Sequence, residues 1–118
     1  MRQEVVRSVD QWRELRQQWN DLLCSSSADQ LFMTWEWLDC WLRVQRAGHD
    51  LLVICVRDDD GQLLGVAPFY KTDYALMKVL PYRVLRMIGD VDSGAEYQTW
   101  IVSAAQEDAV CAEIVRAL

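Results

Sequence analysis

The spacing of apolar residues changes twice along this chain of 118 residues, and this change is what most limits its possible folds. Toward the amino terminus, apolar residues recur at the spacing of one face of an amphipathic helix. The residues of this first repeat are Trp12, Leu15, Trp19, Leu22 and Leu23. Because Ser8 and Gln11 stand ahead of the repeat at capping-box spacing, it predicts a helix over residues 9–24.

A second helical stretch follows the serines at 25–27. Thr34 is its predicted N-cap, and the helix is expected to run to Gly48. Its apolar residues form two adjacent stripes, Trp37, Trp41 and Val44 in one and Trp35, Leu38 and Leu42 in the other. A face this wide predicts contacts on more than one side. The six tryptophans of the chain are interpreted as packing residues of a small core, with an aromatic ligand platform or a partner-docking face as the alternative.

From residue 51 the apolar residues are consecutive and β-branched, which predicts strands instead of helices. Two strands, 51–56 and 63–70, flank the turn sequence at 58–61, Asp-Asp-Asp-Gly, and are expected to form a hairpin. Because proline cannot donate a ladder hydrogen bond, Pro68 is expected at a bulge or an edge, where regular pairing stops.

Two more strands and a final helix complete the predicted order. The strands are expected at 82–88 and 97–102, and Val5 and Val6 add a candidate short leading strand. The helix begins at Ser103, which repeats the capping-box spacing with Gln106, and runs to the end of the chain. This order predicts one α+β domain over residues 1–118, with a mainly antiparallel sheet of four or five strands covered by about three helices.

Charge and residue type exclude several classes of function. Eighteen acidic against twelve basic residues, a formal net charge of −6, oppose binding to a nucleic-acid backbone. The longest apolar run, Leu51 to Val56, is too short to cross a membrane, and the amino terminus lacks the apolar stretch of a secretory signal, so a cytoplasmic protein is expected. The four cysteines lack CxxC pairing and are interpreted as buried, inert thiols, with a structural metal site as the alternative. His49 is the single histidine, so no His-based metal cluster and no Ser-His-Asp or Cys-His arrangement is predicted.

Six short segments follow one another across almost the whole chain: Trp12-x-x-Leu15, Phe32-Met33-Thr34-Trp35-Glu36-Trp37, Leu52 to Asp58 with Gly61, Leu64 to Phe69, Leu85 to Asp90, and Glu96 to Trp100. In this order and spacing they resemble the amino-terminal half of the CelD-like acetyltransferases, a GNAT-superfamily family related to the Fem-type peptidoglycan aminoacyltransferases. The resemblance implies a GNAT-like fold and a longer protein of two GNAT-like halves, of which this chain is the first. It also implies that the acyl-donor site belongs to the missing carboxy-terminal half.

The phosphate-binding loop of the GNAT superfamily is incomplete in this chain. That loop reads Arg or Gln, two residues, Gly, one residue, then Gly or Ala, and Arg86-Met87-Ile88-Gly89 matches its beginning. Val91 stands at the second small position, and Asp90 and Asp92 would place negative charge beside a phosphate. No coenzyme A site is therefore expected in this half, and acyl-CoA is expected only in the full-length protein.

Four residues are candidate catalytic groups. Glu36 lies between two tryptophans, so burial would raise its pKa toward that of a general base, and the alternative is a carboxylate on the helix surface. Asp92, Glu96 and Tyr97 lie with Asp90 between the predicted third and fourth strands, in a loop that faces the substrate cleft in the two-half proteins that this chain resembles. The alternative for this loop is an acidic, solvated turn.

Two functions are compatible with these features. The first is an N-acyltransferase that moves an acyl group from a thioester such as acyl-CoA to an amine, with this half inactive alone. The second is a non-catalytic GNAT-like module that binds a partner through its aromatic helices and an open sheet edge. If the first holds, the surface left bare by the missing half predicts a homo-oligomer, a two-fold dimer that pairs or swaps the strands near Tyr97–Val102.

Overall fold

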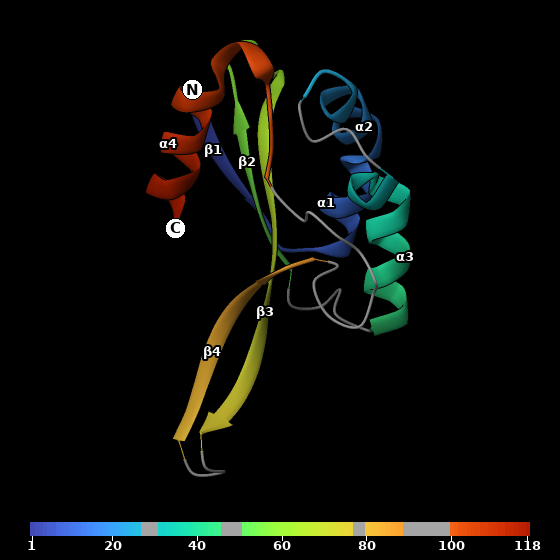
Figure 1. The fold of residues 1–118 in the computed structure, drawn as a ribbon, viewed down its shortest axis with the longest axis vertical. Helices are drawn as coiled ribbons and strands as arrows, with labels where there is room; N and C mark the ends of the chain where they lie inside the picture. Colours follow the sequence, from blue (N-terminus) through green and yellow to red (C-terminus); the bar gives the residue numbers. More distant parts are fainter. Residues whose placement is uncertain (27–30, 46–50, 77–79, 89–99) are drawn as a thin grey trace.

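The computed structural model describes residues 1–26, 31–45, 51–76, 80–88 and 100–118, which form an antiparallel sheet with helices on both faces (Figure 1). The strands are β1 (Arg2–Val6), β2 (Leu51–Arg57), β3 (Leu63–Leu76), β4 (Leu80–Met87) and β5 (Ile101–Val102). The helices are α1 (Val9–Glu14), α2 (Arg16–Cys24), α3 (Trp35–Gln45) and α4 (Glu107–Ala117). None of the helices in these ranges is long and apolar enough to cross a bilayer. The predicted α+β class and antiparallel sheet are confirmed.

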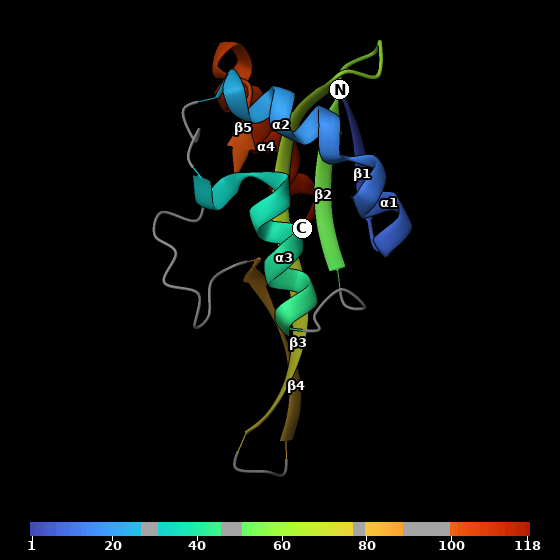
Figure 2. The ribbon, with the colours of Figure 1, turned by 90° about the vertical axis from the view of Figure 1, so that its right-hand side faces the viewer.

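The core consists of two clusters, one on each face of the sheet, because successive side chains of β2 point to opposite faces. Leu51, Val53 and Cys55 belong to the cluster that holds the buried residues of α1, α2 and α3. Ile54 and Val56 belong to the other cluster, with the buried residues of α4. Figure 2 shows the face that carries α2 and α3, with α4 behind the sheet. Three helices therefore cover one face, and α4 alone packs on the other.

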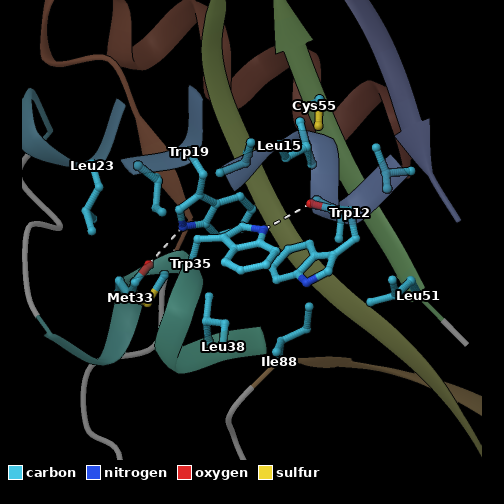
Figure 3. Close-up of a cluster of buried hydrophobic side chains, with 14 of the residues drawn as sticks. Trp12, Leu15, Trp19, Leu23, Met33, Trp35, Leu38, Leu51, Cys55 and Ile88 are labelled. Carbon is cyan, nitrogen blue, oxygen red and sulfur yellow. Dashed lines mark hydrogen bonds between the residues drawn. The ribbon is translucent and has the colours of Figure 1, made fainter. Parts of the chain in front are cut away.

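Three tryptophans, Trp12, Trp19 and Trp35, lie at the centre of the larger cluster (Figure 3). Trp12 and Trp35 stack with ring centroids 5.4 Å apart, and Trp19 meets Trp12 edge-on at 5.2 Å. The Trp12 indole donates a hydrogen bond to Asp39 Oδ1, and the Trp19 indole donates to the Met33 carbonyl. The Trp35 indole donates to the Trp12 carbonyl. Burial thus leaves none of these three donors unsatisfied, and the packing interpretation is confirmed for these tryptophans.

The helix predicted over 9–24 is broken at Leu15 into α1 and α2. In a continuous helix the Trp12 carbonyl would accept a hydrogen bond from the amide of Arg16. Here it accepts the Trp35 indole at 3.0 Å and the amide of Leu15 at 3.1 Å. A side chain that enters the hydrogen-bond ladder in this way breaks a helix. The prediction of one uninterrupted helix is therefore wrong.

Two of the three predicted helix caps are present. Ser8 Oγ accepts an amide hydrogen bond from the first turn of α1, and Thr34 Oγ1 accepts one from the first turn of α3. Ser103 makes no side-chain cap, and a 3₁₀ turn separates it from α4. Its amide instead donates to the Leu64 carbonyl at 2.7 Å, continuing the pairing of β5 with β3. The capping box predicted at Ser103 is wrong because the sheet orients this residue.

β3 is the central strand, because β2 pairs with one of its edges while β4 and β5 share the other. The amide of Ile88, just after β4, donates to the Pro68 carbonyl at 2.8 Å. Pro68 has no N–H to return that hydrogen bond, so the β4 ladder ends there. Ile101 of β5 pairs with Val66, two residues further along the same edge of β3. Pairing with β4 along this edge stops at Pro68, but on the other edge Pro68 stands in regular register with Val53, and the irregularity of that ladder lies between Val56 and Arg57. The expected position of Pro68 at a bulge or an edge is therefore wrong.

Strand boundaries and one helix face differ from the predictions. β4 spans Leu80–Met87 instead of 82–88, and β2 continues to Arg57 instead of ending at residue 56. β3 continues to Leu76 instead of ending at residue 70, because it pairs with β4 beyond the end of β2. Of the strand predicted at 97–102, Ile101 and Val102 form β5, and Trp100 is not part of a strand. Residues 97–99 lie outside the described residues. The predicted end of the second helix at Gly48 also lies outside them. Val44 of α3 is 71% exposed and does not join the packed stripe.

Gly65 of β3 lies against α4. A Cβ atom placed at this position would lie 2.2 Å from Cγ1 of the buried Val110. Gly65→Ala is therefore expected to lower the free energy of unfolding by about 1–3 kcal/mol, the usual cost of overpacking a core. Urea unfolding measures the change.

The double variant Gly65→Ala with Val110→Ala is the control. Because the second substitution makes room for the added methyl group, the double variant should lose less stability than the two single variants added together. A urea midpoint for Gly65→Ala equal to that of the wild type would contradict the close packing of α4 on β3.

Candidate functional site

Glu36 is the one predicted catalytic residue that lies within the described part of the chain. It stands in the first turn of α3, with its side chain 46% exposed. Arg16 Nε lies 2.9 Å from Glu36 Oε1, and Asn20 Nδ2 lies 2.8 and 3.0 Å from the two carboxylate oxygens. Both partners belong to α2, so the carboxylate links α2 to the start of α3.

Glu36 carries a lowered pKa. Partial burial raises this pKa, but the hydrogen bonds from Arg16 and Asn20 and the charge of Arg16 together outweigh burial. A general base is most effective when its pKa lies near the operating pH, so this environment disfavours that role. The expected rise through burial between tryptophans is wrong, because the carboxylate meets polar side chains of α2. The alternative of a carboxylate on the helix surface describes its environment.

The same two residues of α2 also hold Trp35. Asn20 Oδ1 accepts a hydrogen bond from the amide of Trp35 at 3.1 Å, and the Arg16 guanidinium lies 5.7 Å from the centroid of the Trp35 ring. The first amides of a helix lack acceptors within the helix, and a carboxylate in the first turn interacts favourably with the helix dipole. Glu36, Arg16 and Asn20 therefore form a polar clamp that joins α2 to α3.

The other candidates lie outside the described residues: Asp90, Asp92, Glu96 and Tyr97. Gly89 and Val91 of the incomplete phosphate loop lie outside them too. Both flanks of this segment are described, and Ile88 and Ile101 are fully buried. They meet β3 at Pro68 and Val66, which are two residues apart on one edge. Ile88 and Ile101, the described residues on either side of the segment that carries three of the four predicted catalytic residues, thus both lie in the core.

The four cysteines are free thiols that differ in exposure. Cys55 of β2 is buried, and burial together with a nearby carboxylate raises the pKa of its thiol to about 12. Burial and neighbouring carboxylates also raise the pKa of Cys111. A raised pKa disfavours the thiolate and hence nucleophilic reactivity. Cys24 and Cys40 are exposed on α2 and α3, so the prediction of burial is wrong for these two.

A cavity of about 310 Å³ lies between α2, the turn that joins β2 to β3, and the residue that follows β5. The lining residues are Gln18, Asp21, Leu22, Ser25, Gly61, Gln62, Leu63, Leu64 and Ser103. Reasoning from the sequence did not predict this site, because its walls come from three distant segments and its residues form no motif. Glu36, the predicted catalytic residue within the described part of the chain, is not among the residues that line it.

Comparison of this chain with protein-family models, with curated proteins and with solved structures finds no match. The resemblance to the CelD-like acetyltransferases therefore stays a prediction from the sequence. Functional inference rests on that resemblance and on the geometry described above.

Glu36→Gln is expected to remove a pH-dependent contribution to stability. Because the pKa of Glu36 is lowered in the folded protein, its pairing with Arg16 contributes fully above the ordinary value of 4.5 and is lost as the pH falls through the folded pKa. At pH 7 the variant should be less stable by at most about 1 kcal/mol, because the pair is well exposed to solvent. Toward acid pH the two proteins should converge in the free energy of unfolding, measured by urea denaturation at a series of pH values.

Glu14→Gln is the matched control, because Glu14 is exposed on the neighbouring helix α1. The wild type and this control should show the same dependence of stability on pH. A wild-type advantage over Glu36→Gln that grows toward acid pH would mean that the pKa of Glu36 is raised, as a buried general base would require.

Proposed function

We propose that this chain is the amino-terminal half of a CelD-like acyltransferase of the GNAT superfamily, which transfers an acyl group from a thioester such as acyl-CoA to an amine. The ordered resemblance of its six segments supports the proposal, and so does the α+β fold with a helix-covered antiparallel sheet, the class that the resemblance implies. The segments fall on successive elements of one fold. Trp12 lies in α1, Trp35 opens α3, and Pro68 ends the ladder between β3 and β4.

The observation that most supports the proposal is the position of Ile88 and Ile101, the described residues on either side of the segment with the candidate catalytic residues. Both residues are buried and meet one edge of β3 at neighbouring positions. Catalytic groups need anchored supports, and this segment holds Asp92, Glu96 and Tyr97. In the proposed reaction the amine nitrogen bonds to the acyl carbon, the bond to sulfur breaks, the amine proton passes to a base and the thiolate takes up a proton. We assign the proton transfers to these three residues.

The acyl-donor site belongs, in this proposal, to the missing carboxy-terminal half. Arg86-Met87-Ile88-Gly89 matches only the start of a phosphate loop, and Asp90 and Asp92 add negative charge where a phosphate would bind. The partner is therefore that second half, and the cofactor of the full-length protein is acyl-CoA. We place the protein in the cytoplasm, and its four free cysteines support a reducing compartment.

A non-catalytic binding or assembly module is the second candidate function. The clamp at Glu36 favours it, because the one predicted catalytic carboxylate among the described residues is held by Arg16 and Asn20 in a structural role. A module of this kind needs no acyl donor.

The 118-residue chain is expected to bind acetyl-CoA no more tightly than about 1 mM. The physical reason is that its phosphate loop is incomplete and carries two aspartates. Calorimetric titration into this chain and into the full-length protein tests the proposal, with tighter binding expected for the full-length protein. Micromolar binding to this chain would overturn the placement of the donor site, and absence of binding to both proteins would favour the non-catalytic module.

The chain is also expected to self-associate. Val115 and Leu118 are each 59% exposed at the end of the chain, in and just after α4, and Cys111 lies on the same helical stripe. Exposed apolar surface of this kind favours contact between copies. Light scattering over a concentration series should show a mass above 13.7 kDa that Val115→Lys reduces, whereas Val9→Lys on α1 leaves it unchanged. A monomer at high micromolar concentration would favour a self-contained module.

A further inference from the structure

The cavity beside α2 has two walls that are linked by one partly buried cation. Arg57, at the end of β2, is only 14% exposed in its side chain. Its Nη1 atom donates to Gln18 Oε1 on α2 and to the Gly61 carbonyl on the turn, both at 2.9 Å. Gln18 and Gly61 both line the cavity. The guanidinium therefore fixes the separation of the two walls.

The wall formed by the turn is ordered by its own hydrogen bonds. Asp58 Oδ1 accepts from the amides of Asp60 and Gln62, both at 2.9 Å. Gly61 adopts a φ of 86°, in the left-handed region that favours glycine. A cavity whose walls are ordered in this way binds a ligand with little loss of conformational freedom.

The lining combines an apolar floor with an acidic rim. Leu22 and Leu63 are buried and form the floor. Among the described residues that line the cavity, Asp21 is the only ionisable one, and its Oδ1 accepts a hydrogen bond from Gln17 at 2.9 Å. Ser25 stands at the carbonyl end of α2, where the helix dipole is negative.

The charges behind the walls do not reverse this balance. Arg57 Nε lies 3.2 Å from the carboxylate of Glu4, so its positive charge has a partner away from the cavity. The turn beside Gly61 carries Asp58, Asp59 and Asp60. Two cations oppose it: Arg2, whose Nη2 would lie 3.7 Å from a Cβ atom placed at Gly61, and the amino-terminal ammonium, 3.9 Å from Asp59 Oδ1. Among the described residues around the cavity, the negative charges still outnumber the positive ones. The electrostatic environment therefore favours a cationic ligand over an anionic one.

We propose that this cavity binds a small organic ammonium ion, a primary amine with a short alkyl chain. Asp21 holds the ammonium group, and the alkyl chain lies on Leu22 and Leu63. The volume of about 310 Å³ is at the lower end of the range of about 300–1,000 Å³ found for small-molecule sites. The site stands on the cavity alone and requires no acyl donor, so it holds or fails independently of the proposed acyl transfer.

Titration of the isotopically labelled chain with butylammonium, butyrate and butanol, followed by amide NMR shifts, tests the proposal. Butylammonium should produce saturable shifts at Asp21, Ser25 and Gln62. Butyrate and butanol, which match its alkyl chain but not its charge, should bind about two- to fivefold more weakly, the size expected for one exposed ion pair. High salt should remove most of this difference.

Asp21→Asn should weaken butylammonium binding by about two- to fivefold, and Asp21→Lys should make butyrate the preferred ligand. Asp10→Asn is the matched control, because it removes the same charge from an exposed position on α1, and it should leave binding unchanged. Equal binding of the three ligands, unchanged affinity in Asp21→Asn, or no saturable shift with butylammonium would each overturn the proposal.

Discussion

The hydrogen bond from the Trp35 indole to the Trp12 carbonyl is the interaction on which most of the helical layer depends. It stacks the two rings in the core and breaks the first helical segment at Leu15. Beyond that break, α2 takes a separate course and presents Arg16 and Asn20 to the first turn of α3. The same helix supplies one wall of the cavity. The position of α2, and with it both the polar clamp and the cavity wall, thus depends on the hydrogen bond that the Trp35 indole donates to the Trp12 carbonyl.

Pro68 has a similar influence on the sheet, because it has no backbone N–H to donate. β4 and β5 lie along one edge of β3, and the missing N–H separates them. Ile88 and Ile101, which flank the candidate catalytic segment in the sequence, meet β3 on either side of this interruption. Meanwhile Gly65, on the same strand, lets α4 approach the backbone closely. β3 therefore supports the core on both faces and anchors the segment on which the proposed chemistry depends.

The two carboxylates Glu36 and Asp21 show how neighbours decide what an acidic side chain can do. Glu36 meets Arg16 and Asn20, so its charge is compensated within the protein and serves to join two helices. Asp21 accepts one hydrogen bond from an uncharged amide, so its charge is available at the rim of a cavity. The sequence singled out Glu36 because tryptophans flank it, and it offered no pattern that marked Asp21.

Local spacing in the sequence was sufficient for the α+β class, the antiparallel hairpin and the caps at Ser8 and Thr34. Each of these follows from hydrogen bonds or steric limits within a few residues, which a sequence states directly. Tertiary structure decided the break at Leu15, the failure of the Ser103 cap, the exposure of Cys24 and Cys40, the partners of Glu36 and the cavity. These depend on residues distant in the chain, such as Trp35 on Trp12 and Leu64 on Ser103. Periodicity determines which face of an element is apolar, but only packing determines which side chain lies opposite each polar group.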